Sequence, residues 1–129
     1  MVNKNKESLL KKTILLVEDD EDAQVLGRIH LQTKYNVFTV ASVKEAKTKL
    51  QKESVDLILL DLALKGDEDG LELVKFIRKS KEWSDLPIVA LTAHAYSSDQ
   101  RRCIDAGCNE FLSKPIKWPL VLERINPFI

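Results

Sequence analysis

Residues 55–61, VDLILLD, decide the fold: they form a short, almost continuously apolar run that ends in an acid. The run at 14–17, ILLV, has the same form and is followed directly by Glu18 and Asp19. Runs this short, bounded by turn residues, favour strands, although periodicity alone would also allow a buried helix. Because neither run alternates polar with apolar residues, both sheet faces should be covered, which is typical of a parallel sheet.

The rest of the chain alternates between further short strands and amphipathic segments. Ser42 and Glu45 have the spacing of a capping box, and Gly107 is placed to end a helix. This alternation predicts one α/β domain with a parallel sheet between helices. Further strands are predicted at 37–41, 88–91 and 110–113, and helices at 24–33, 42–50, 71–79, 97–106 and 119–125.

The bulk composition is that of an ordinary globular domain. The chain has 129 residues, 44% of them hydrophobic and 31% charged, and its net charge is zero. Zero net charge argues against a nucleic-acid partner held by phosphate attraction. No apolar run approaches the roughly 18 residues that span a membrane, so no membrane insertion is expected. We expect a flexible tail at 1–12 and one domain at 13–129.

The two cysteines, Cys103 and Cys108, lack the CxxC spacing and have no cluster of His or Cys around them to complete a zinc site. We interpret them as reduced thiols, which indicates a cytoplasmic protein.

The informative polar residues follow the predicted strands. Ligands of open parallel sheets bind outside the carboxyl ends of the strands, where the strand order reverses. Each residue alone could be a cap, a loop residue or a solvated charge, but their joint placement predicts that they converge on one edge of the sheet. They are Glu18 and Asp19 after the first strand, Asp61 after the third, Thr92 after the fourth and Lys114 after the fifth.

Their chemistry is complementary. Clustered carboxylates repel one another unless a cation joins them, and oxygen ligands in so sparse a site suit Mg²⁺. A hydroxyl and an ammonium group supply the donor and the positive charge that a phosphoryl group needs. An Asp carboxylate can attack phosphorus as a nucleophile. The set therefore predicts Mg²⁺-dependent phosphoryl transfer to Asp61.

Four blocks in order, ILLVEDDED, LILLDLALKGDEDGLEL, IVALTAHA and GCNEFLSKPI, resemble the signature blocks of the response-regulator receiver family over residues 13–125. The resemblance implies a flavodoxin-like five-stranded parallel sheet of order 2-1-3-4-5. It also implies that Asp61 is the phosphoacceptor. By position, Glu18, Asp19, Asp61 and the main-chain carbonyl of Ala63 match the metal ligands.

The same resemblance assigns further roles. Thr92 and Lys114 match the residues that bind the phosphoryl group. Thr92 and Phe111 match the pair of switch residues, which change conformation when the acceptor is phosphorylated. Ala63 and His94 fall where the family tunes loss of the phosphoryl group. The bond between Lys114 and Pro115 resembles one that is cis in the family.

The sequence departs from the family pattern in two places. The loop after Asp61 lacks the common proline and is one residue longer, and its acids, Asp67, Glu68 and Asp69, are interpreted as a solvated face. Phe111 replaces the frequent tyrosine, so this ring cannot form a hydrogen bond at the surface.

Three other readings compete with a switchable receiver. A dehalogenase-like phosphatase would need a second Asp two residues after Asp61, where this chain has Ala63. A flavin-binding protein of the same fold would need a phosphate-binding loop after the first strand, where residues 18–22 read EDDED. A receiver that only docks, without phosphorylation, is the third reading, and the complete acceptor set argues against it.

The resemblance also implies partners. A sensor histidine kinase or a histidine phosphotransfer domain would supply the phosphoryl group, and a stand-alone receiver would pass the signal to an unknown downstream protein. The output face would comprise the helices predicted at 97–106 and 119–125 and the strand at 110–113. The basic residues near it fit either an output face or a solvated surface; they are Arg101, Arg102, Lys117 and Arg124.

Overall fold

The computed structural model describes residues 11–64, 69–93 and 97–129, with 97–99 as backbone only. All the strand pairs in the sheet are parallel, and their order is β2-β1-β3-β4-β5, as predicted. The strands are β1 (Thr13–Val17), β2 (Asn36–Val40), β3 (Leu57–Asp61), β4 (Ile88–Thr92) and β5 (Glu110–Ser113).

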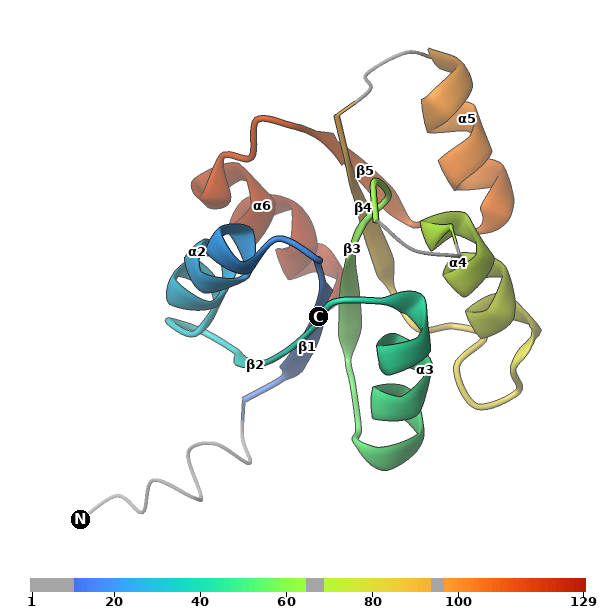
Figure 1. Ribbon diagram of the computed structural model, residues 1–129, viewed down its shortest axis with the longest axis horizontal. Coiled ribbons are helices and arrows are strands. Elements are labelled where there is room, and N and C mark those ends of the chain that lie inside the picture. The colour runs from blue at the N-terminus through green and yellow to red at the C-terminus, as the bar shows by residue number, and fades with distance from the viewer. Residues whose placement is uncertain (1–10, 65–68, 94–96) are drawn as a thin grey trace.

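Helices cover both faces of the sheet, with α2 and α6 on one side and α3, α4 and α5 on the other (Figure 1). The continuous apolar runs are explained by this arrangement, because successive residues of one strand enter opposite cores. Leu15 and Val17 belong to the core under α3 and α4, whereas Ile14 and Leu16 belong to the core under α2 and α6. The helices are α2 (Glu21–Leu31), α3 (Val43–Lys52), α4 (Gly70–Lys79), α5 (Ser97–Ala106) and α6 (Trp118–Ile125).

Side-chain caps set the helix starts. Asp20 caps α2 by accepting a hydrogen bond from the Ala23 N–H at 2.9 Å, so this helix begins three residues before the predicted apolar pattern. Ser42 caps α3 and accepts from the Glu45 N–H at 3.1 Å. The Glu45 carboxylate reaches back to the Ala41 N–H, at 2.9 Å, one residue earlier than in a standard capping box.

The carboxyl end of α5 closes as predicted at Gly107, whose φ is +117°. The Cys108 N–H donates to the Cys103 carbonyl at 3.0 Å, and the Gly107 N–H donates to the Ile104 carbonyl at 3.0 Å. These two bonds define a Schellman motif. Arg78 of α4 stabilises this motif, because its Nε donates to the Gly107 carbonyl at 2.9 Å.

Arg78 also joins this turn to the connection between α4 and β4. Its guanidinium donates to the Leu86 carbonyl at 2.7 Å, to the Ser84 carbonyl at 3.1 Å and to Asn109 Oδ1 at 2.8 Å. Asn109 Oδ1 accepts in addition from the Ile88 N–H at 2.9 Å. One side chain therefore fixes the amino ends of β4 and β5 relative to α4.

The two ends of the domain differ from the sequence prediction in detail. Residues 1–10 of the expected tail lie outside the described residues, whereas the carbonyls of Lys11 and Lys12 both accept hydrogen bonds from Asn36. A 3-10 turn, η1 (Asn126–Phe128), follows α6 and was not predicted. Within the described ranges, the helices are too short and too polar to cross a membrane.

Candidate functional site

Strand ends bring the predicted site residues together at one edge of the sheet. Glu18 follows β1, Asp61 and Thr92 are the last residues of β3 and β4, and Lys114 follows β5. A cleft of about 520 Å³ opens at this edge. Its lining is strongly acidic and comprises Glu18, Asp19, Asp20, Glu21, Asp22, Asp61, Ala63 and Lys114.

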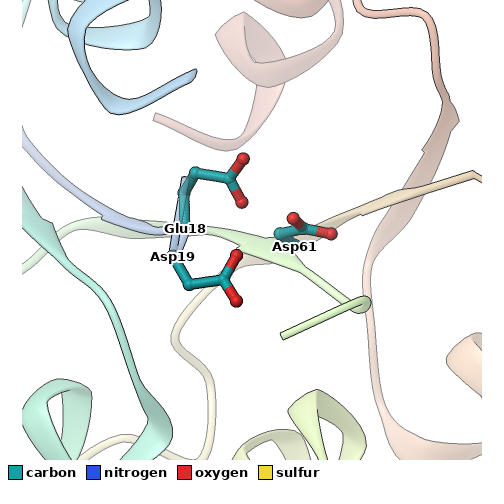
Figure 2. Close-up of side chains that lie close together, drawn as sticks. All are labelled: Glu18, Asp19 and Asp61. Carbon is teal, nitrogen blue, oxygen red and sulfur yellow. The ribbon is translucent and has the colours of Figure 1, made fainter. Parts of the chain in front are cut away.

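Three carboxylates form the centre of the cleft. Figure 2 shows Glu18 and Asp19 extending from the end of β1 toward Asp61, and one oxygen from each of the three carboxylates lies within 4.8 Å of the others. Glu18 and Asp61 are nearly inaccessible, with 7% and 3% of their surface exposed. Glu18 Oε2 is buried and has no hydrogen-bond partner among the described residues. Buried polar atoms are normally satisfied, so this oxygen indicates a missing ligand.

The orientation of Asp61 is fixed from both sides. Its Oδ1 accepts from the Ala63 N–H at 2.9 Å, and its Oδ2 forms an ion pair with Lys114 Nζ at 2.9 Å. Lys114 is itself placed by its backbone N–H, which donates to the Thr92 carbonyl at 2.7 Å. The peptide bond between Lys114 and Pro115 is cis, as the resemblance implied.

Glu18 and Asp61 compete for one proton. Burial alone would raise the pKa of Asp61, but the hydrogen bonds from Glu18, from the Ala63 N–H and from Lys114 outweigh burial and hold this pKa below its ordinary value. Burial first, and then the hydrogen bond and the negative charge of Asp61, raise the pKa of Glu18 from 4.5 to about 8. The shared proton therefore favours Glu18, and Asp61 favours its ionised form.

This donor set fits a hard divalent cation. The ligand atoms are carboxylate oxygens, two of the three carboxylates are buried, and one buried oxygen has no hydrogen-bond partner in the described part of the chain. Mg²⁺ is bound in proteins by one or two carboxylates, with water at its remaining positions. Ala63, whose carbonyl the sequence prediction assigned to the metal, lines the same cleft.

Thr92 and Phe111 lie on the same face of the sheet, because Phe111 pairs with Ala90 and Thr92 is two residues beyond Ala90. Thr92 is 4% exposed, and Phe111 is half-buried against the core under α3 and α4. A second pocket, of about 230 Å³, lies beside Thr92 and is also lined by Ala63 and Cys103. His94, the other residue predicted to tune phosphoryl loss, lies outside the described residues, as do Asp67 and Glu68.

Two polar residues near the cleft have roles that the sequence prediction missed. Gln24 Nε2 donates to the Glu18 carbonyl at 2.5 Å and so ties α2 to the end of β1. Asp69, predicted to be merely solvated, caps α4 by accepting from the Leu71 N–H at 3.1 Å. Its position directly before an apolar helical pattern was a usable signal for the cap, whereas the Gln24 contact depends on how α2 approaches the sheet.

Comparison with known proteins agrees with this geometry. The family model described as the response regulator receiver domain matches residues 14–126. The polar-differentiation response regulator DivK of Brucella ovis is 31% identical over 121 residues, covering 93% of this chain and 98% of that protein. The chemotaxis protein CheY4 of Vibrio cholerae superposes with a TM-score of 0.86 at 26% identity, covering 92% and 99% of the two chains.

A third similar structure contains a metal ion. The receiver domain of a sensor histidine kinase from Pseudomonas aeruginosa PAO1 has a TM-score of 0.83 at 32% identity, and 92% of this chain and 97% of that chain are covered. That structure has magnesium coordinated in its active-site cleft.

Proposed function

Since the chain belongs to the response regulator receiver family and is a receiver domain of two-component or phosphorelay signalling, we propose that Asp61 is its phosphoacceptor. The observation that carries this proposal is the environment of Asp61, a buried and ionised carboxylate that faces an acidic cleft and a lysine. We propose further that residues 13–129 form the domain and residues 1–12 its tail, and that the protein works in the cytoplasm.

Asp61 acts as the nucleophile. A lone pair on one carboxylate oxygen forms the new bond to phosphorus while the bond from phosphorus to the donor breaks. The Ala63 N–H and Lys114 hold the carboxylate in a single orientation before the donor arrives. Such positioning is the main contribution a protein makes to phosphoryl transfer.

Glu18, Asp19, Asp61 and the carbonyl of Ala63 are the proposed ligands of Mg²⁺. When bound, the ion neutralises the charge of the carboxylates and of the incoming phosphoryl oxygens. The orphaned Oε2 of Glu18 supports its inclusion, either directly or through a bound water. Asp20 is left out of this ligand set because one oxygen of its carboxylate caps α2.

Lys114 and Thr92 receive the new phosphoryl group. Once Asp61 is phosphorylated to an acyl phosphate, the Lys114 ammonium loses its partner oxygen and can pair with a phosphoryl oxygen instead. Thr92 supplies a hydroxyl by moving toward the cleft, and Phe111 fills the space that Thr92 leaves. We propose that this movement reshapes the face made by α5, β5 and α6, which then binds the downstream target.

The phosphoaspartate should be a persistent signal. The residue two positions after Asp61 is Ala63, which offers no carboxylate to activate water, so the rapid turnover of a phosphatase is not expected. The domain would promote its own phosphorylation and lose the group slowly. That His94 speeds loss of the phosphoryl group stays a prediction. Replacing His94 with Ala should lengthen the lifetime of the phosphoryl group.

Receiver domains interact with histidine kinases and with downstream targets, and we propose a histidine kinase or a histidine phosphotransfer domain as the donor. Helix α2 provides a docking face beside the cleft. Val25, Leu26 and Ile29 on this helix are 50%, 53% and 59% exposed, whereas large apolar side chains elsewhere are mostly buried. An exposed apolar strip of this kind marks a protein contact.

The test is phosphorylation of the purified protein by a small acyl phosphate in the presence of Mg²⁺. Intact-mass spectrometry should show one added phosphoryl group on the wild type and none on Asp61→Asn. Asp69→Asn is the matched control, because it removes one exposed carboxylate near the cleft while Asn still caps α4. Labelling that survives in Asp61→Asn would refute the assignment.

A further inference from the structure

The two cysteines lie side by side at the corner between α5 and β5. Cys103 is in the last turn of α5, and Cys108 is the second residue past the end of that helix. In a Schellman motif these two positions are joined by a backbone hydrogen bond, and their side chains contact each other. Here the backbone bond is 3.0 Å long, and the two thiols form a hydrogen bond.

This geometry is compatible with a disulfide. A direct N–H to carbonyl bond between the two residues holds their Cα atoms within roughly 7 Å, the upper limit for a disulfide without backbone movement. Both side chains are buried and therefore confined. Confinement of two reacting groups at contact distance greatly favours their reaction with each other over reaction with a second molecule.

Cys103 is buried, with 1% of its surface exposed, but it borders a pocket. Cys103 lines the pocket of about 230 Å³ beside Thr92, which Ala63 and Arg102 also line. A hydroperoxide is small enough to enter such a pocket. Cys108 does not line this pocket, and burial raises the pKa of Cys108 to about 12. Cys103 is therefore the thiol that a small oxidant in the pocket would meet first.

We propose that Cys103 and Cys108 are an oxidisable pair that closes to an intramolecular disulfide in response to a hydroperoxide. The Cys103 sulfur attacks the peroxide, which gives a sulfenic acid and one water from hydrogen peroxide. The Cys108 sulfur then attacks the sulfenic sulfur and gives its proton to the departing hydroxyl, so the S–S bond forms and a second water leaves. Two electrons pass from the thiols to the peroxide, and a dithiol reductant reverses the change.

The modification would tie α5 to the start of β5. Cys103 is part of α5, which belongs to the proposed output face, and it lines the same pocket as Thr92. A disulfide would therefore fix the position of this helix by a route that does not involve Asp61.

Oxidation of the purified, folded protein tests the proposal. The folded protein is treated with hydrogen peroxide, quenched with catalase, then denatured in iodoacetamide and weighed. We expect a loss of about 2 Da and no alkylation, against two alkylated thiols in the reduced protein. Digestion on the amino side of Asp105 should then give two peptides that only a reductant separates.

Variants make the result specific. Cys103→Ser and Cys108→Ser should each lose the 2 Da change, and Asp61→Asn should retain it, which separates this site from the proposed phosphoacceptor. Peptide mapping of the wild type decides the matter even where a Ser variant folds poorly. Two alkylated thiols after oxidation, added oxygen without a crosslink, or a crosslink only between chains would each overturn the proposal.

Discussion

Metal binding in the acidic cleft should release a proton, and this coupling makes the affinity for Mg²⁺ depend steeply on pH. The metal-free protein holds a proton on the buried Glu18 carboxyl, whose pKa is about 8. A divalent cation favours ionised carboxylates, so it binds in competition with that proton. Lowering the pH from 8 to 6 should therefore weaken binding without any change in the ligands.

The magnitude follows from the pKa. With a pKa of about 8, about half of the Glu18 carboxyl groups are ionised at pH 8 and about 1% at pH 6, so the apparent affinity should fall by more than tenfold, or about 2 kcal/mol. At pH 7 about 0.9 protons should leave for each ion bound. Titration of Asp61 does not contribute to the pH dependence between 6 and 8, because the pKa of Asp61 is held below its ordinary value.

Titration calorimetry at pH 7 in two buffers of different ionisation enthalpy measures the released proton. Glu18→Gln should abolish both the proton release and the pH dependence between 6 and 8. Asp20→Asn, which keeps the cap of α2 and borders the same cleft, should retain both. A wild-type affinity that is flat between pH 6 and pH 8, with no proton released, would refute the shared proton.

The same group links the stability of the metal-free protein to pH. The folded-state pKa of Glu18 is raised above 4.5, so its stabilising effect is full below about pH 4.5 and is lost as the pH rises through about 8. Chemical unfolding of wild type and Glu18→Gln at several pH values should show this decline only in the wild type. Saturating Mg²⁺ should remove the decline, because the ion stabilises the ionised cluster.

Three further predictions concern other parts of the molecule. Arg78→Met should lower the free energy of unfolding by about 3 kcal/mol, because two of the Arg78 hydrogen bonds are to part-buried carbonyls. Urea titrations measure this loss, and a value below about 1 kcal/mol would contradict the stabilising role of Arg78. Thr92→Ala should still accept a phosphoryl group, yet NMR shifts around Phe111 on phosphorylation should shrink, and equal shifts in both proteins would separate Thr92 from the switch. Leu26→Asp should slow phosphotransfer from a protein donor at least tenfold while leaving labelling by a small acyl phosphate unchanged; equal slowing of both would argue against a docking role for α2.

The sheet and the candidate site could be predicted for related reasons. Apolar runs that end in polar residues identify both the buried strands and the edge at which their carboxyl ends meet. The pattern at 55–61 therefore indicated the place of Asp61 as well as the strand β3, and the structure has both. Local caps were accessible too, because Ser42 and Gly107 act within a few residues of themselves.

Features that depend on tertiary approach could not be predicted in this way. The hydrogen bonds of Arg78 reach residues up to 31 positions away, so no local pattern indicates them. The pKa of Glu18 depends on its distance from Asp61, which is 43 positions later in the sequence. The cysteine contact is different: it follows from the Schellman spacing around Gly107 and could have been expected from the sequence.

The distribution of the site along the chain has a consequence for synthesis in the cell. A ribosome would make Glu18 well before Lys114, which follows the last strand of this sheet, and among the described residues β5 pairs with β4 alone at the edge of the sheet. A nascent chain thus exposes its acids long before the lysine that balances them has emerged. The ability to signal should accordingly appear late and in one step, when β5 joins the sheet. A partly translated receiver should therefore not accept phosphoryl groups from its donor protein.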